Sequence, residues 1–423
     1  MPAITTLWEP FGLSGNPFFQ SELKPGDRAH PISLFVGRER ELERVCRRLS
    51  TDTATRTIIE GAPGVGKTSF VNRLKSELAQ MGVATYAQPI RIDSTSTRSS
   101  FIADVLRTLL RIRLAAGLRN GSGIWARTSR LLEGEDLCGV NVSVLGAGAG
   151  FSRGYVAPQA PPDSLYEHLG AALVELTGEL DAPVVLHVNN LEALTSEGVE
   201  AAATLILDVR DYLLLRGAHW IFVGATGIED AIFRRHRQVG GIFPQALVLE
   251  SLPAAAVENL LTLRYRHLKL PRQRLAAPIE PGEAARLYAL YQGDLRNFLR
   301  LLTEAAEALL GVHGVRPMTE AEVRAFGAAE YAHRLRERLG TDDFTHLGRL
   351  LADGASEVRV TDAVRSTRLS QGAASKLFQR LEAKKAIQFT RTAGKSRFYR
   401  PLGDVMIAFG VTPDALLPAR DPE

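Results

Sequence analysis

The chain has 423 residues, a length that predicts about two to three domains at roughly 150 residues each. Its 45% hydrophobic and 23% charged residues are ordinary for a globular protein and exclude bulk disorder. Two cysteines are too few for a disulfide framework or a cysteine-rich metal site, and they suit a reducing compartment. We find neither a signal-peptide pattern nor an apolar stretch of about 18 residues, so we expect a cytoplasmic protein without a membrane partner.

The formal net charge of +4 conceals an uneven distribution. The segment from Val358 to Arg400 holds eleven basic residues against the two acids Asp362 and Glu382, a net charge of +9. The rest of the chain therefore carries −5. A basic segment joined to a mildly acidic body predicts that contacts with a polyanion such as DNA are confined to the C-terminal part.

Residues 1–33 are rich in proline and glycine and predict an extended N-terminal arm. Strand-like and helix-like segments then alternate over 34–250, which predicts an α/β core with a parallel sheet. The expected strands are Thr57–Glu60, Ala84–Ile92, Val184–Val188, Trp220–Gly224 and Ala246–Leu249. The expected helices follow Lys67, span Arg98–Arg113, begin at Ser164 with a capping box to Glu167, and span Gly198–Leu215.

Two further regions differ in character from this core. Residues 138–160 combine alternating valines with the runs GAGAG and VAPQAPP, which predicts a β-hairpin inserted into the core and a flexible return. Over 251–339 the strand signals disappear and helical patterns dominate, with a capping box formed by Thr319 and Glu322. We expect this region to be a helical lid.

The segment Gly61–Thr68, GAPGVGKT, matches the phosphate-binding pattern GxxxxGK[ST]. It follows an apolar strand and precedes the helix Ser69–Gln80, which is the setting that the mechanism needs. Glycines let successive N–H groups face an anion, and the helix N-terminus adds partial positive charge. Lys67 is expected to bridge the β- and γ-phosphates of ATP, and Thr68 to bind Mg²⁺. The nucleotide-binding residues expected here are Gly61, Pro63, Gly64, Val65, Gly66, Lys67, Thr68 and Ser69.

About 25 residues before this loop, the segment Phe35-Val-Gly-Arg-Glu-Arg-Glu-Leu42 resembles the base-contacting box of AAA+ ATPases. More narrowly, the segment resembles the branch of this family that contains origin-recognition proteins, archaeal replication-initiator proteins and bacterial ATPases of similar build. The resemblance covers about Leu34 to Gly410 and implies a P-loop AAA+ core, a helical lid and a winged-helix domain. It also implies that Val36 and Gly37 contact adenine.

The same resemblance places the Walker B position at the end of the strand Val184–Val188. There the family has an Asp that holds the Mg²⁺ shell and an acid that orients the attacking water. Asn189 and Asn190 occupy these places, and Glu192 is a candidate substitute. Because an amide cannot accept a proton, hydrolysis of the β–γ phosphoanhydride bond is expected to be slow or stimulated by a partner. The resemblance implies ATP and Mg²⁺ as cofactors, with Thr68 and Asn189 on the metal.

Two sensors and an arginine finger complete the implied site. Thr226, after the strand Trp220–Gly224, is the polar sensor of the γ-phosphate. Arg296, in the stretch GDLRNFL, resembles the second sensor, which reaches the phosphates from the lid. The cluster Arg234, Arg235 and Arg237 either supplies a finger to a neighbouring subunit, with Arg237 favoured, or is a solvated helix end. The candidate catalytic residues are Lys67, Asn189, Asn190, Glu192, Thr226 and Arg237.

Residues 340–410 show three helical patterns and then two short strands around a turn, followed by a tail over 411–423. Ser370 is a plausible N-cap for the helix Gln371–Ala383. This order resembles a winged helix, whose second helix enters the major groove of double-stranded DNA while the wing approaches phosphates. The expected DNA-binding residues are Gln371, Ser375, Lys376, Gln379, Arg380, Arg391, Lys395 and Arg397.

Three functional hypotheses follow. The first is an ATPase that acts as a nucleotide-controlled DNA-binding or DNA-loading protein and forms a homo-oligomer in the ATP state. The second is an ATP-gated signalling or defence switch that recruits an effector protein. The third is a transcription regulator with a non-hydrolysing ATP site. The arm motif GLSGNPF also resembles the lead-in of bacterial ATPases linked to transposition.

Overall fold

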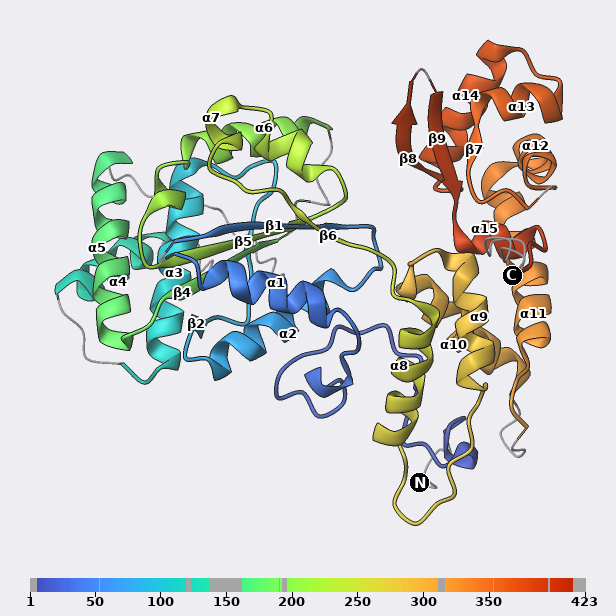
Figure 1. Ribbon diagram of the computed structural model, residues 1–423, viewed down its shortest axis with the longest axis horizontal. Helices are drawn as coiled ribbons and strands as arrows, with labels where there is room; N and C mark the ends of the chain where they lie inside the picture. Colours follow the sequence, from blue (N-terminus) through green and yellow to red (C-terminus); the bar gives the residue numbers. More distant parts are fainter. Residues whose placement is uncertain are drawn as a thin grey trace, which may run out of the picture.

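The computed structural model describes residues 6–52, 54–118, 123–136, 162–189, 191, 196–310, 316–352, 354–394 and 396–413. The hairpin expected at 138–160 therefore lies outside the described residues. Figure 1 shows the α/β core with its sheet, the helices α8–α11 beside it, and a C-terminal module seated on those helices away from the sheet. No helix of the described residues is long and apolar enough to cross a membrane.

The core sheet is parallel, with strand order β2-β4-β5-β1-β6 and β3 paired with β4. Its strands are β1 Arg56–Gly61, β2 Ala84–Thr85, β3 Ile90–Arg91, β4 Val184–Asn189, β5 Ala218–Gly224 and β6 Leu247–Leu249. The single strand expected over Ala84–Ile92 is wrong, because the chain forms two short strands there. Pro89 lies between them, and proline has no N–H to donate to a sheet ladder.

Helices cover both faces of this sheet, and side chains of β5 point alternately to the two faces. Ile221 and Val223 of β5 pack with α1 and α2, whereas Trp220 and Phe222 pack on the opposite face with α3, α5 and α6. The helices are α1 Glu39–Leu49, α2 Lys67–Gln80, α3 Arg98–Ala115, α4 Gly123–Asp136, α5 Pro162–Leu180, α6 Ser196–Asp208 and α7 Arg237–Gly240.

Several helix boundaries differ from the expectation, most of them by one or two residues. Helix α5 begins at Pro162 and not at Ser164, because proline is well suited to the first turn of a helix. Helix α6 ends at Asp208, and the residues expected to continue it form a separate 3₁₀ turn over Tyr212–Leu214.

Four helices make up the expected lid region: α8 Ala254–His267, α9 Pro281–Tyr291, α10 Leu295–Leu309 and α11 Glu320–Leu339. The capping box is present at α11, where the Thr319 side chain accepts a hydrogen bond from the Glu322 amide and the Glu322 side chain accepts one from Thr319. Asp294 caps α10, and its Oδ1 accepts a hydrogen bond of 3.1 Å from the Asn297 amide.

The N-terminal arm is not a free extended segment. Trp8, Phe11, Leu13 and Phe18 are buried in the same hydrophobic cluster as the lid helices. The main chain follows them, because Ser14 N–H donates to the carbonyl of Leu268 at 2.8 Å. Burial of these large apolar side chains outweighs the local tendency of a proline- and glycine-rich segment to stay extended.

The C-terminal module contains α12 Thr341–Leu351, β7 Val358–Arg359, α13 Val360–Thr367, α14 Gln371–Ala383, β8 Ile387–Ala393, β9 Ser396–Pro401 and α15 Gly403–Ala408. Its antiparallel sheet has the order β7-β9-β8. The Ser370 hydroxyl caps α14 by accepting a hydrogen bond from the Ala373 amide. This arrangement is compatible with a winged helix. The lid and the module share one continuous hydrophobic cluster, separate from the clusters of the sheet.

Candidate nucleotide-binding site

The loop between β1 and α2 turns its backbone through two glycines. Gly64 has φ +78° and Gly66 has φ +95°, a left-handed conformation that glycine adopts at little cost. Gly66 is also the N-cap of α2 and supplies no side-chain cap. The first amides of α2 therefore lack a side-chain acceptor at this end, where an anion is favoured.

Lys67 lies buried under this loop. Its Nζ donates to the carbonyls of Gly61 at 2.9 Å and Ala62 at 3.1 Å. Phosphate oxygens can take the place of these carbonyls, because both are oxygen acceptors and the phosphate carries full charge. The lysine is thus held at the loop in the position that the sequence pattern predicts.

The loop borders a cavity of about 340 Å³, within the size range of small-ligand sites. Its walls come from the N-terminal arm, the box around Val36, the loop and the lid. The sequence-predicted residues that line it are Val36, Pro63, Gly64, Val65, Gly66, Lys67, Thr68, Ser69 and Arg296. Gly37 and Gly61 do not line it, because Gly37 lies against Leu252 and Gly61 against Leu249.

Arg296 belongs to the first turn of α10, directly after the turn formed by Gly293 and Asp294. This turn presses on the phosphate loop, because a Cβ atom added to Gly64 would overlap the Oδ1 of Asp294. Residues distant in the sequence are thereby brought together, and both the loop and the start of α10 line the cavity.

The carboxyl ends of β1, β4 and β5 meet at one edge of the sheet, because the strands are parallel and adjacent. Half-buried Asn189 ends β4, and exposed Thr226 follows β5 at this edge, but neither lines the cavity. Asn190 and Glu192 lie outside the described residues. The turn that carries Thr226 is held by buried Glu60 of β1, whose carboxylate accepts hydrogen bonds from the amides of Gly227 and Glu229.

The described residues contain no group of three or more His, Cys, Asp or Glu side chains that could hold a metal ion by themselves. The donor set near the loop is instead the Thr68 hydroxyl, with the Asn189 amide at the same sheet edge. Mg²⁺ is often bound through one or two protein ligands together with substrate phosphates, so these residues fit an ion that arrives with a nucleotide.

Sequence reasoning missed Arg38, which lies in the box beside Val36. Its side chain is 4% exposed and donates to the carbonyls of Val65 at 3.0 Å and Glu250 at 2.7 Å. It therefore ties the box to the phosphate loop and to the segment that enters the lid. Its position inside the box was the available signal, but charge alone could not show that the side chain is buried.

Comparison with known proteins identifies the domain that carries this site. Residues 34–215 match the family model described as AAA ATPase domain. These residues form an AAA ATPase domain. The AAA+ part of the predicted resemblance is thus confirmed, and the match includes Val36, the phosphate loop and Asn189. Thr226, Arg237 and the lid lie beyond the matched residues.

Solved structures with a similar overall fold include proteins of two organisms. The Orc1 protein of Aeropyrum pernix, solved in complex with DNA, is 16% identical with a TM-score of 0.42, covering 90% of this chain and 92% of that one. The ORC2 protein of the same organism is 14% identical with a TM-score of 0.48, covering 96% and 98%. A Walker-type ATPase of Pyrococcus abyssi is 13% identical with a TM-score of 0.49, covering 93% and 99%. No curated protein matches the sequence.

The arginine cluster lies just beyond the matched part of the AAA ATPase domain. Arg234 forms an ion pair with Glu229, and Arg235 forms one with Glu200. Arg237 begins α7, is exposed, and has no ion pair within the part of the chain that the structure describes. Arg237 therefore differs from its two neighbours in having no ion pair among the described residues. None of the three arginines lines the cavity.

The expected DNA-contacting face lies on α14 and the hairpin β8–β9. Gln371, Ser375, Lys376, Gln379 and Arg380 are all exposed on α14, as are Arg391 on β8 and Arg397 on β9. Lys395 lies outside the described residues.

Two of these cations are not free, which corrects the expectation that all are available. Arg380 forms an ion pair of 2.6 Å with Asp343 of α12, and Arg391 forms one of 2.7 Å with Glu357. Arg380 donates two hydrogen bonds to the Asp343 carboxylate. Arg391 donates one to Glu357, whose other oxygen accepts from the Thr390 hydroxyl. The physical reason is that a guanidinium forms strong charge-assisted hydrogen bonds with a carboxylate within reach.

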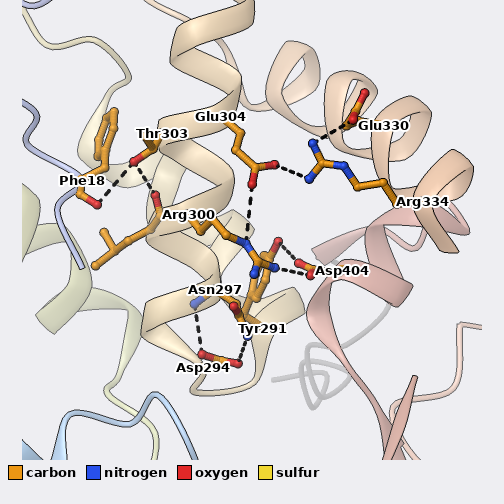
Figure 2. Close-up of polar contacts among 11 residues, drawn as sticks. Phe18, Tyr291, Asp294, Asn297, Arg300, Thr303, Glu304, Glu330, Arg334 and Asp404 are labelled. Carbon is orange, nitrogen blue, oxygen red and sulfur yellow. Dashed lines mark hydrogen bonds and ion pairs between the residues drawn. The ribbon is translucent and has the colours of Figure 1, made fainter. Parts of the chain in front are cut away.

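A polar network joins the lid to the C-terminal module, and much of it is drawn in Figure 2. The Tyr291 hydroxyl donates to Asp404 of α15 at 2.9 Å, and Arg300 of α10 pairs with the same carboxylate. Arg400 of β9 donates to the carbonyl of Gln292 at 3.2 Å. Burial raises the pKa of the Asp404 carboxyl, and the Arg300 charge opposes that rise.

Proposed function

We propose that this protein binds ATP with Mg²⁺ in its AAA ATPase domain and uses the bound nucleotide to control a DNA-contacting C-terminal module. One observation carries the proposal. Arg296, in the first turn of α10, lines the same cavity as the phosphate loop, and Arg300 of this helix pairs with Asp404 of the module. The same helix therefore touches both the nucleotide site and the output module.

The first step is nucleotide binding. The triphosphate lies on the amides of the phosphate loop, and Lys67 leaves the loop carbonyls to contact phosphate oxygens. Arg296 then reaches the same phosphates from the lid. Because the loop and Arg296 attract one anion from two sides, ATP draws the start of α10 and the loop together. A nucleotide without the γ-phosphate carries less negative charge, so it attracts Arg296 more weakly.

The second step is transmission to the module. The lid and the module share one hydrophobic cluster, whereas the sheet has its own. Closely packed side chains transmit displacement because interiors resist compression. The module therefore follows α10 when the lid moves against the sheet.

The third step is DNA binding. The recognition helix α14 offers Gln371, Ser375, Lys376 and Gln379 to base edges and backbone, and Arg397 of the wing offers a charge to phosphates. Phosphate contacts release counterions, so the affinity falls steeply as salt rises. The body, at −5, repels the polyanion and confines contact to the module.

Hydrolysis of the β–γ bond is proposed to be slow or partner-stimulated. Asn189 at the end of β4 can accept a hydrogen bond from a metal-bound water, but its amide takes no proton. A neighbouring subunit in an ATP-state homo-oligomer supplies Arg237, whose exposed guanidinium is the unpaired member of its cluster within the described chain.

A second candidate function is a nucleotide-gated switch whose module recruits an effector protein. The ion pairs Arg380–Asp343 and Arg391–Glu357 favour it, because they place carboxylates among the cations of the expected DNA face. The third hypothesis, a non-hydrolysing transcription regulator, shares the DNA contact and differs only in lacking turnover.

Duplex-binding titrations at several salt concentrations, with ATP, with ADP and without nucleotide, test the proposal. We expect ATP to tighten binding of the wild type by at least about fivefold. Lys67→Ala should bind DNA without responding to ATP, and Arg266→Gln on the exposed face of α8 should behave as the wild type. Absence of duplex binding at low salt would overturn the DNA role and favour the effector switch.

Two further measurements address catalysis and assembly. Equal phosphate release by the wild type and Lys67→Ala would remove the hydrolase claim and leave the non-hydrolysing regulator. Mass measurement with and without ATP tests the oligomer, and an unchanged monomer would discard the role of Arg237.

A further inference from the structure

The N-terminal arm runs along the nucleotide cavity from the lid to α2. At the lid, the Asn16 side chain donates to the Thr303 hydroxyl of α10 at 3.2 Å. At α2, the Leu23 amide donates to the Ser69 hydroxyl at 3.2 Å, and Asn72 donates to the Leu23 carbonyl at 2.9 Å. The segment Phe19–Leu23 lies between these attachments and forms one wall of the cavity.

Arg264 of α8 holds this wall in place. Its guanidinium is buried and donates to the carbonyls of Pro17 at 3.1 Å and Phe19 at 2.8 Å. Its guanidinium carbon also lies 3.8 Å from the centre of the Phe19 ring. Its Nε has no hydrogen-bond partner among the described residues. Burying a charged guanidinium costs free energy. Because the hydrogen bonds of Arg264 go to two carbonyls of an irregular segment, the side chain fixes the position of that segment.

The cavity beside this wall offers two kinds of surface that suit a nucleobase. Phe19, Leu34, Val36 and Leu260 provide apolar surface against a flat aromatic ring. The main-chain N–H groups of Gln20, Ser21 and Glu22 lack a hydrogen-bond acceptor within the described part of the chain. A purine edge carries ring nitrogens that accept such bonds, whereas phosphates are already served by the loop and α2.

We propose that Phe19–Leu23 is the base-binding wall of the nucleotide site and that Arg264 is the positioning residue that holds it there. The inference rests on the proposed nucleotide binding and extends it to a segment upstream of the box that contains Val36. It assigns the arm to recognition of the base and not to recognition of the phosphates.

Hydrogen exchange on the wild-type protein tests this with two probes, Mg²⁺–ATP and Mg²⁺–tripolyphosphate. Both should slow exchange of the phosphate-loop amides, but ATP alone should slow the amides over 19–23. Protection of the loop by ATP with no change in the arm would overturn the inference and leave nucleotide binding intact. Protection by neither probe would overturn both.

Affinity measurements on variants give a second test. Arg264→Gln should weaken ATP about tenfold while tripolyphosphate binding stays within about twofold, and Arg264→Lys should recover part of the loss. Arg266→Gln, exposed on the same helix, is the matched control. Equal losses for both probes would contradict a role in positioning the base wall.

Because Arg264 is buried, its substitution can disturb the fold. A second pair of variants is therefore placed at an exposed residue of the arm. Ser21 is exposed, so Ser21→Pro removes one main-chain N–H and Ser21→Ala keeps it. We expect the proline variant to lose ATP affinity selectively over tripolyphosphate, and to lose more of it than the alanine variant, which keeps the N–H. Identical ATP affinities for the two variants would overturn the assignment of the arm amides to the base.

Discussion

The hydroxyl of Tyr291 donates a 2.9 Å hydrogen bond to Asp404 across the boundary between the lid and the C-terminal module. The same carboxylate pairs with Arg300 of α10, and the ring of Tyr291 packs on Gly403. One acidic side chain thus joins the end of α9, the middle of α10 and the start of α15. The turn that leads into Arg296 is therefore anchored to the module and not only to the lid.

Tyr291→Phe tests this anchor, because it keeps the ring and removes one hydrogen bond. A bond of this kind contributes about 1 kcal/mol, so the ATP-dependent gain in duplex affinity should shrink by up to about fivefold. ATP affinity itself should stay within about twofold, because the phosphate loop is untouched. Tyr166→Phe on α5 is the matched control, and duplex titrations with and without ATP are the measurement. A full ATP response in Tyr291→Phe would contradict coupling through Asp404.

Gly64→Ala probes the contact between the phosphate loop and the lid. The residue has φ +78°, and the new methyl group would overlap the Oδ1 of Asp294. We expect about tenfold weaker ATP binding, because α10 must retreat and carry Arg296 with it. In this background Arg296→Ala should add little, although it weakens ATP binding in the wild type.

Gly66→Ala separates strain from overlap in this experiment. It has a similar left-handed φ of +95°, yet a Cβ atom there meets nothing within 4 Å. Arg296→Ala should therefore keep its effect in the Gly66→Ala background. Calorimetric titration of the wild type, the three single variants and the two double variants forms the two cycles, and identical coupling in both would refute the lid contact.

Lys376 and Arg380 should respond differently to alanine, although both are exposed cations on α14. Lys376→Ala should weaken duplex binding and reduce the salt slope by about 1. Arg380→Ala leaves the buried carboxylate of Asp343 without its partner, so it should lower the free energy of unfolding by about 1–3 kcal/mol. Arg338→Ala on α11 is the control for loss of charge. If the salt slope falls equally in both α14 variants, the Arg380–Asp343 ion pair breaks on DNA binding and Arg380 contacts phosphate.

Lys75 predicts a pH dependence of stability. It lies buried in α2, with Nζ donating to the carbonyls of Tyr86 at 2.7 Å and Ala87 at 3.2 Å. Burial lowers the pKa of its ammonium to about 8 from an ordinary value of 10.5. Between these values the unfolded chain binds more protons than the folded protein, so the free energy of unfolding should rise with pH. The cost of the buried charge is fully present below pH 8.

Lys75→Met isolates this contribution, because it removes the titrating group and keeps much of the volume. The difference in unfolding free energy, wild type minus variant, should increase from about pH 8 to 10.5 by up to about 3 kcal/mol. Denaturant titrations at stepped pH measure it. A difference that stays flat over this range would mean that Lys75 titrates as an exposed lysine does.

The phosphate loop was predictable because its determinants are contiguous. Strand, glycines, lysine and helix follow one another within a few residues, so the local pattern specifies both the turn and the anion site. The caps at Thr319 and Ser370 were predictable for the same reason, since a cap and its amide lie three residues apart.

The arm and the module show what local pattern could not supply. Glycine and proline predicted an extended arm, but Trp8 and Phe18 found their partners in helices about 250 residues further along the chain. The +9 counted over Val358–Arg400 was correct as a sum, yet Asp343 and Glu357 lie outside that window and pair with two of its arginines.

By itself the sequence determined a phosphate-binding loop, an α/β core and a basic C-terminal segment, because each depends on neighbours in the chain. Only the tertiary structure decided which charges remain free, that the arm walls the cavity, and that α10 joins the nucleotide site to the module. Those features depend on contacts between residues far apart in sequence, and burial of apolar side chains is what brings them together.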